Sequence, residues 1–140
     1  MESYSVNEMY VGQKAEFTKV IAAEDIDMFS AVTGDCNPVH IDSEFAKTSI
    51  FGERIAHGML SAGLISAALG TRLPGVGAIY LTQSLKFTAP VKIGDTVTAE
   101  VEVLEIDTVK NRVRMRTVGT NQNGVMVVEG EALLKPNKKN

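Results

Sequence analysis

The sequence lacks the features that would place it in a membrane, in a secretory route or in a disulfide-rich class. It contains one cysteine, Cys36, so no disulfide can form within the chain, which fits a reducing compartment. No apolar run approaches the roughly 20 residues that a membrane-spanning helix needs. The first residues, MESYSVNEMYVG, show neither the basic nor the apolar region of a secretory signal. We therefore expect a soluble, cytoplasmic protein.

An excess of positive charge is also missing. Lys and Arg number 14 against 17 Asp and Glu, which gives a net charge of -3. A nucleic-acid partner would normally require a basic patch, so we expect none. The 140 residues are the length of one domain, and a hydrophobic fraction of 44% is enough for a core. We therefore interpret residues 1–140 as a single domain.

The most hydrophobic segment is residues 57–70, HGMLSAGLISAALG. It carries no charged side chain, its large and small apolar residues are mixed, and Gly70 offers a stop signal. A helix that is apolar on almost every side must be buried on almost every side. The segment therefore predicts a central helix.

Alternation with a period of two dominates the chain after this helix. In Val97–Val103 every odd position is apolar, with Glu100 and Glu102 between them. This pattern predicts antiparallel strands with one dry and one wet face, and such a sheet can wrap the buried helix to give an α+β fold. Strands are expected at Gly12–Ile21, Ala78–Thr88, Val97–Val103, Arg112–Arg116 and Val125–Leu134. Short helices are expected at Ala23–Val32 and at Ser43–Ala46, the second with Ser43 as its N-cap.

A turn-rich segment, Gly34-Asp35-Cys36-Asn37-Pro38-Val39-His40, lies between the two short helices. Pro38 lacks a backbone N–H and disfavours helical geometry at Asn37, so we do not expect an ordinary helix here. If the loop folds back, it brings the Asp35 carboxylate and the His40 imidazole together as an acid–base pair. On the residues alone, a structural turn is the favoured explanation, with Asp35 as a cap and His40 as a loop histidine, because turn chemistry fully accounts for the Asp, Asn and Pro.

These residues resemble the (R)-specific enoyl-CoA hydratase family, also called enoyl-CoA hydratase 2 or MaoC-like. The family pattern is an aromatic residue, a spacer, small-Gly-Asp-x-Asn-Pro-aliphatic-His, five residues and a small residue. The matching positions are Phe29, Val32–Asp35, Asn37–His40 and Ala46, with further resemblance at Ala56–Leu60, Tyr80–Phe87 and Pro90–Asp95. The resemblance implies a hot-dog fold, in which an antiparallel sheet wraps a long central helix, and a homodimer or dimer-based oligomer.

The resemblance also implies a reaction, the reversible hydration of trans-2-enoyl-CoA to (3R)-3-hydroxyacyl-CoA. Asp35 and His40 would share the activation of water and the delivery of a proton. Asn37 would help to hold the water, the Gly58 backbone N–H would serve as the oxyanion-hole donor, and Ser66 would line the acyl pocket. The plainer alternatives are a turn-forming asparagine, a packing glycine and a serine bonded to its own helix.

His57, just before Gly58, is interpreted as a structural cap of the central helix. Cys36 stands at the variable position of the motif and is not expected to be a nucleophile. No metal is expected, because two histidines with Asp35 and Asp42 show no metal-binding spacing. A calcium loop and a dinucleotide fingerprint are also incomplete. No cofactor is expected, since CoA is part of the substrate.

Two other functions stay open. One is a 3-hydroxyacyl-carrier-protein dehydratase of the same fold, and the other is a non-catalytic acyl-thioester-binding subunit. An acyl-CoA thioesterase is less favoured, because the motif belongs to hydration. An intact Asp35–His40 pair argues against the binding subunit, which would not need it. The sequence encodes neither acyl length nor pathway.

Overall fold

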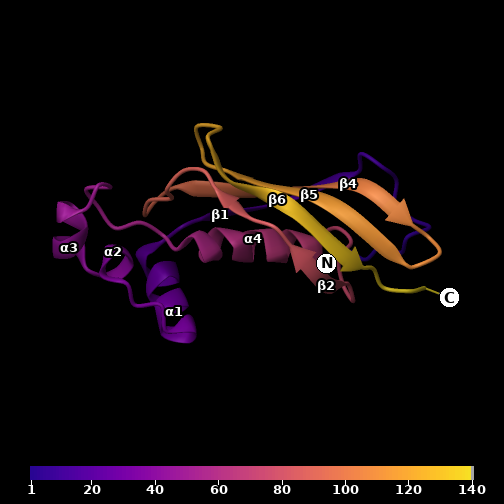
Figure 1. Ribbon diagram of the computed structural model, residues 1–140, viewed down its shortest axis with the longest axis horizontal. Coiled ribbons are helices and arrows are strands. Elements are labelled where there is room, and N and C mark those ends of the chain that lie inside the picture. The colour runs from indigo at the N-terminus through magenta and orange to yellow at the C-terminus, as the bar shows by residue number, and fades with distance from the viewer. Residues whose placement is uncertain (140) are drawn as a thin grey trace.

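A six-stranded antiparallel sheet packed on one long helix forms the body of the molecule (Figure 1). The computed structural model describes residues 1–139. The strand order is β1-β4-β5-β6-β2, and β3 also pairs with β6. In chain order the elements are β1 (Lys14–Val20), α1 (Ala23–Thr33), α2 (Pro38–Ile41), α3 (Ser43–Thr48), α4 (Gly58–Thr71), β2 (Ile79–Gln83), β3 (Lys86–Phe87), β4 (Thr96–Asp107), β5 (Arg112–Thr120) and β6 (Met126–Lys135).

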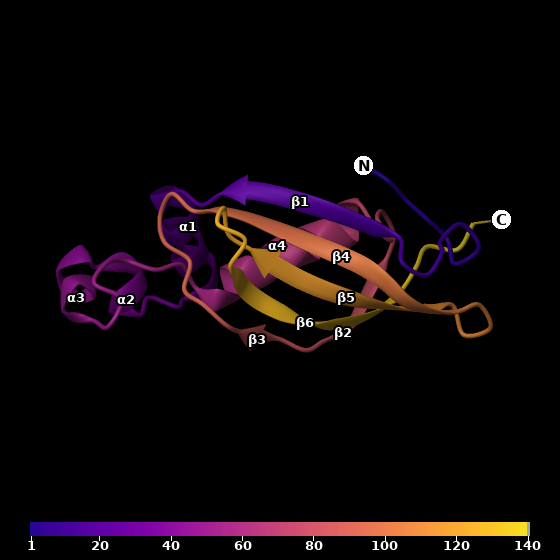
Figure 2. The same ribbon diagram turned by 90° about the horizontal axis from the view of Figure 1, so that it is seen from above.

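The core lies between α4 and the inner face of the sheet. Leu64, Ile65 and Leu69 of α4 belong to one buried cluster together with the odd positions of β4 and β5, such as Val101 and Met115. The alternation expected in Val97–Val103 and in Arg112–Arg116 is confirmed, because every second residue in these ranges is buried. Figures 1 and 2 show α4 running along the sheet, while α1, α2 and α3 gather beyond its N-terminal end. Among residues 1–139, no helix is both long and apolar enough to cross a membrane.

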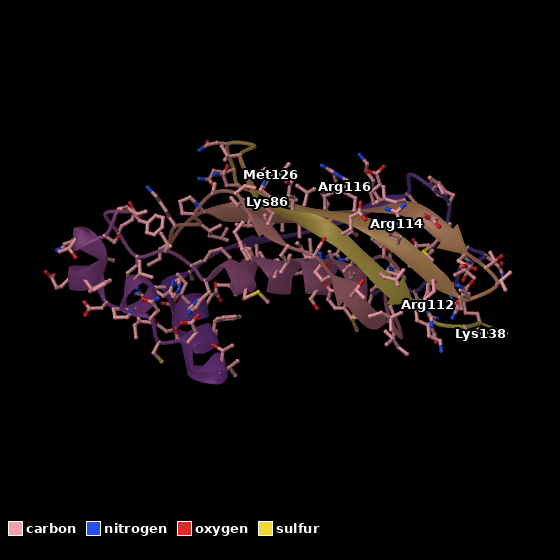
Figure 3. All side chains as sticks on the ribbon, viewed as in Figure 1. Lys86, Arg112, Arg114, Arg116, Met126 and Lys138 are labelled. Atoms are coloured by element: carbon pink, nitrogen blue, oxygen red, sulfur yellow. The ribbon has the colours of Figure 1, made fainter. Side chains whose placement is uncertain are left out.

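The outer face of the sheet carries charged side chains, as Figure 3 shows for the labelled Arg114 and Arg116. Arg114 pairs with Glu105 and Glu131 on the two neighbouring strands, each at 3.0 Å. Its hydrogen bonds to Glu105 and Glu131 raise the pKa of the Arg114 guanidinium. These charged side chains are exposed, so this face is a solvated surface. Exposed ion pairs of this kind contribute little stability.

Two details of the turn-rich segment differ from expectation. Pro38–Ile41 forms a single helical turn, because Pro38 sits at the first helical position, where its missing N–H is harmless. The cap of α3 is Asp42 and not Ser43. The Asp42 Oδ1 accepts the N–H groups of Glu44 at 3.0 Å and Phe45 at 3.2 Å, so the carboxylate satisfies two amides of the first turn.

The central helix is present, but one side of it is open. Gly70 does not end α4, which continues through Thr71. Leu64 and Leu69 are buried, whereas Met59 is 55% exposed and Ser66 is also exposed. The expectation of burial on almost every side is therefore wrong for the single chain.

The strand expected over Ala78–Thr88 is also different. It is split into β2 and β3, with an irregular register between Tyr80 and Thr82. The intervening chain crosses close over Gly130, where a Cβ would lie 1.8 Å from the Ser84 carbonyl oxygen. Ile79 and Phe87 are about half exposed, at 52% and 51%. Among residues 1–139, most of the expected dry face is therefore uncovered, although Leu85 packs partly against the core.

Candidate active site

A cleft of about 470 Å³ lies at the N-terminal end of α4. Its walls come from the turn before α2, from α2 itself, from the chain between α3 and α4, from the start of α4, from β3 and the chain after it, and from β6. Most lining side chains are apolar, for example Phe51, Phe87 and Val91, and the polar ones include Asp35, His40, His57 and Ser61. An apolar cleft with a few convergent polar groups is the usual form of a small-molecule site.

Local turn chemistry places the first of these groups. Gly34 ends α1 with a φ of 81° and donates its N–H to the Ser30 carbonyl at 2.9 Å, a geometry that favours glycine. The Asp35 Oδ1 accepts the Asn37 N–H, and the Asn37 Oδ1 accepts the Val39 N–H, both at 3.3 Å. Asn37 is therefore the N-cap of α2, so its interpretation as a turn former is confirmed.

The structure brings Asp35 and His40 together. One carboxylate oxygen of Asp35 and one ring nitrogen each of His40 and His57 all lie within 4.8 Å of one another. His40 Nδ1 is 2.8 Å from the Ile55 carbonyl oxygen, which can only accept, so Nδ1 carries a proton. The His40 Nε2 is then the nitrogen left for proton exchange.

Arg54 supports the backbone of this site, and sequence reasoning missed it. Its Nε donates to the His40 carbonyl at 2.5 Å, and its Nη2 pairs with the Asp27 carboxylate of α1 at 2.7 Å. Arg54 thus links α1 to α2 through these two contacts. A lone arginine beside an acidic residue in a loop gives no sequence signal for such a contact.

His57 occupies the N-cap position of α4, but its side chain caps no amide among residues 1–139. Its ring is 2% exposed and stacks on the His40 ring, with centroids 3.9 Å apart and planes at 26°. Its Nε2 lies 3.1 Å from the Ser30 Oγ and 3.0 Å from the Asp35 carbonyl oxygen. His57 is therefore the N-cap residue of α4, as expected, but within the described residues its side chain does not make the cap and instead contacts both members of the expected pair.

Gly58 is the first residue of α4 and lines the same cleft. N–H groups in the first turn of a helix have no acceptor within the helix, and this end of a helix carries partial positive charge. A Cβ at Gly58 would lie 2.7 Å from the Cδ1 and Cε1 atoms of Phe87. The packing interpretation of Gly58 is thus supported, and it is compatible with a role for its amide.

Ser66 does not line this cleft, and its expected role in lining the acyl pocket stays a prediction. It is two turns further along α4, about 12 Å at the rise of an α-helix. It lines a second hollow of about 550 Å³ against β2, where burial raises the pKa of the Tyr80 phenol. The hydroxyl that α4 contributes to the first cleft is that of the buried Ser61, which sequence reasoning missed. Its signal was a hydroxyl about one turn after Gly58 in a helix without charged side chains.

The proximity of Asp35, His40 and His57 is also compatible with a cation, which the spacing did not predict. Two observations favour an acid–base pair instead. The in-plane nitrogen lone pairs of two stacked rings do not point at a common centre. His40 Nδ1 and His57 Nε2 already lie within hydrogen-bond distance of protein oxygens. The expectation of no metal stays a prediction.

Comparison with known proteins identifies the family. Residues 6–127 match the family described as MaoC like domain. This chain belongs to the MaoC-like domain family. The "(R)-specific enoyl-CoA hydratase" of Rhodospirillum rubrum is 55% identical over 121 residues, 86% of this chain and 83% of that protein. The "3-hydroxybutyryl-CoA dehydratase" of Methylorubrum extorquens is 47% identical over 132 residues, 94% of this chain and 83% of that protein.

The solved structures of MaoC-like proteins agree with this assignment. The unliganded R-hydratase of Pseudomonas aeruginosa superposes with a TM-score of 0.94 at 55% identity, covering 98% of this chain and 88% of that one. The hot-dog fold expected from the motif is therefore confirmed, with α4 as its central helix.

Proposed function

We propose that this chain catalyses the reversible hydration of trans-2-enoyl-CoA to (3R)-3-hydroxyacyl-CoA. The observation that carries the proposal is the convergence of Asp35 and His40 in an apolar cleft that ends at the N-terminus of α4. The named activities of relatives that match most of this chain support it. The (R) configuration rests on those relatives, since no distance in the site encodes a stereochemical face.

Asp35 and His40 would act as one acid–base unit. In hydration the water oxygen bonds to the β-carbon, one water proton leaves and the α-carbon gains a proton. The pair takes up the first proton and delivers the second, so it ends each cycle in its starting state. The Nδ1 of His40 is engaged by the Ile55 carbonyl, so proton exchange would run through Nε2.

The charge that develops on the thioester oxygen needs a donor. The Gly58 N–H lies at the N-terminus of α4 and lines the cleft that holds the pair. A preorganised amide at this end of a helix favours negative charge, so we assign it to the oxyanion hole. Asn37 uses its Oδ1 to cap α2, so its amide nitrogen would be the group that holds the attacking water, although Asn37 is not among the residues that line the cleft. CoA enters only as part of the substrate.

The test is the loss of the conjugated enoyl absorbance when purified protein meets crotonyl-CoA. We expect rapid loss with the wild type, and rates lower by about 100- to 10,000-fold in Asp35→Asn and in His40→Gln. Asp42→Asn is the matched control, because Asp42 lies in the same segment but caps α3 outside the cleft. Chiral analysis of the product then tests the (R) assignment.

The same assay separates the alternative functions. Activity only with acyl-carrier-protein thioesters would favour the carrier-protein dehydratase. If folded wild-type protein hydrates no enoyl thioester of any chain length on either carrier, the hydratase proposal fails and the binding subunit replaces it.

We further propose that a second copy of the chain covers the open side of α4. We call the exposed apolar side chains there the open edge, which consists of Met59, Ile79, Tyr80, Leu81 and Phe87. Among residues 1–139, the strand β2 pairs only with β6, so the other edge of β2 has no strand beside it there. A dimer across this surface would cover both the apolar side chains and the hollow that contains Ser66.

A further inference from the structure

We infer that His57 is a positioning residue for Asp35 and His40, with its ring proton on Nε2. Its expected effect on rate rests on the proposed hydration, whereas its protonation pattern can be tested without any substrate. The inference starts from a side chain that is 2% exposed and yet contacts both members of the proposed pair.

The first contact fixes the backbone of Asp35. The His57 Nε2 lies 3.0 Å from the Asp35 carbonyl oxygen, and a carbonyl only accepts hydrogen bonds. The proton must therefore sit on Nε2 for this bond to form. The Ser30 hydroxyl of α1, itself buried, lies 3.1 Å from the same nitrogen. One imidazole thus links α1, the turn that carries Asp35 and the start of α4.

The second contact fixes the ring of His40. The two imidazoles stack with centroids 3.9 Å apart, and Phe29 packs on His57 with centroids 4.6 Å apart. The Ile55 carbonyl holds the edge of the His40 ring, and His57 covers one of its faces. A rotation of His57 would therefore disturb the Asp35 backbone and the His40 plane together.

The remaining nitrogen of His57 supports the same tautomer. Nδ1 is buried and has no hydrogen-bond partner among residues 1–139. A proton placed there would be a buried donor without an acceptor, which is unfavourable. The titratable groups that approach the ring are the Asp35 carboxylate and the His40 imidazole, whereas Phe29 and Ser30 of α1 carry none.

Two substitutions separate the two contacts. His57→Gln keeps an N–H near the Nε2 position and loses the ring, and His57→Phe keeps the ring and loses the donor. We expect each to lower kcat for crotonyl-CoA by about 10- to 100-fold, the scale of a small misplacement of reacting groups, with much smaller changes in KM. The pH profile of kcat should also shift, because in both variants the imidazole of His57 beside the His40 ring is replaced. Val103→Ala, in the core and outside both hollows, controls for lost stability.

Nuclear magnetic resonance of the ¹⁵N-histidine-labelled protein reads the tautomer directly. The chain has two histidines, so His57→Phe assigns both rings. We expect the His57 proton on Nε2 and a lone pair on Nδ1. A proton on Nδ1, or a folded His57→Phe with wild-type kcat and pH profile, overturns the inference. If wild-type protein hydrates no thioester, the proposed function fails, and the observed tautomer still decides whether His57 donates to Asp35.

Discussion

Gly58 is the residue at which the start of α4 touches β3. An added Cβ would meet the Phe87 ring at 2.7 Å, so either the ring or the helix must move. We expect Gly58→Ala to lower kcat by about tenfold or more, because even a small shift of the first turn displaces the amide assigned to the thioester oxygen. The initial rate with crotonyl-CoA measures this effect. The double variant Gly58→Ala/Phe87→Ala removes the clash, so we expect it to recover part of the lost initial rate. No recovery would contradict this explanation.

Gly70 supplies a matched glycine at the other end of the same helix. Apart from its two chain neighbours and the backbone of its own helix, a Cβ there would have no atom within 4 Å among the described residues, and the φ of Gly70 is not positive. We expect Gly70→Ala to stabilise the protein by about 0.5–1 kcal/mol, because alanine loses less backbone entropy in a helix. Denaturant unfolding measures the gain, and the hydration rate should not change. A destabilised Gly70→Ala would contradict the helical environment described here.

Sequence reasoning was most accurate where one local rule controls one residue. It identified Asp35 and His40 because a motif of defined positions contains them. It named Ser66 and missed Ser61, since both are hydroxyls on α4 and the packing of β2 and β3 decides which of them lines the first cleft. It placed His57 at the start of α4 but missed the contacts of its ring for a similar reason: its partners Ser30 and His40 are distant in the sequence.

At the scale of elements, α2 is a single turn that cannot be stable alone. Asn37 caps its start, and Arg54 holds the His40 carbonyl while pairing with Asp27. We expect Arg54→Ala to lower kcat by about tenfold, because His40 then sits on a less constrained turn.

The activity assay checks this, with circular dichroism to confirm folding. Asp27→Asn is the comparison, since it removes the charge pair and keeps the bond from Arg54 to His40. An Asp27→Asn that loses as much activity as Arg54→Ala would show that the contact between α1 and Arg54 matters more than the bond to the carbonyl.

The elements that the sequence predicted well are those whose surroundings lie within the chain. The apolar positions of β4 and β5 face α4, so their alternation directly reflects burial. The pattern in Ala78–Thr88 is equally regular, but Ile79, Leu81 and Phe87 stay exposed, while Leu85 packs only partly against the core. A period-two pattern predicts that one face of a strand will be buried. It does not show whether that face is buried by the same chain or by another one. The missed Asp42 cap has a different cause, since Asp42 and Ser43 are both good N-caps and only the backbone geometry chooses between them.

At the scale of the whole molecule, the open edge and the open side of α4 form one continuous feature. Both expose apolar side chains on one side of the body, whereas the outer face of the sheet is covered by charged residues such as Arg114 and Glu131. Large apolar surfaces of this kind on soluble proteins usually mark an interface. A dimer would resolve why the sequence of α4 predicts burial on nearly every side while the single chain leaves one side open.

Leu81 provides the direct test of that dimer. It is 41% exposed on β2 and belongs to the open edge, so in a dimer an aspartate there would be placed against apolar side chains without a partner. We expect the wild type to be dimeric or larger by light scattering after gel filtration, and Leu81→Asp to shift towards monomer.

Val109→Asp is the control for added charge, because Val109 is 94% exposed in the turn between β4 and β5 and lies outside the open edge. It should leave the oligomeric state unchanged. A monomeric wild type would remove the proposal. A wild-type dimer that survives Leu81→Asp would place the interface elsewhere, and the hollow around Ser66 would then be an open surface that no second chain completes.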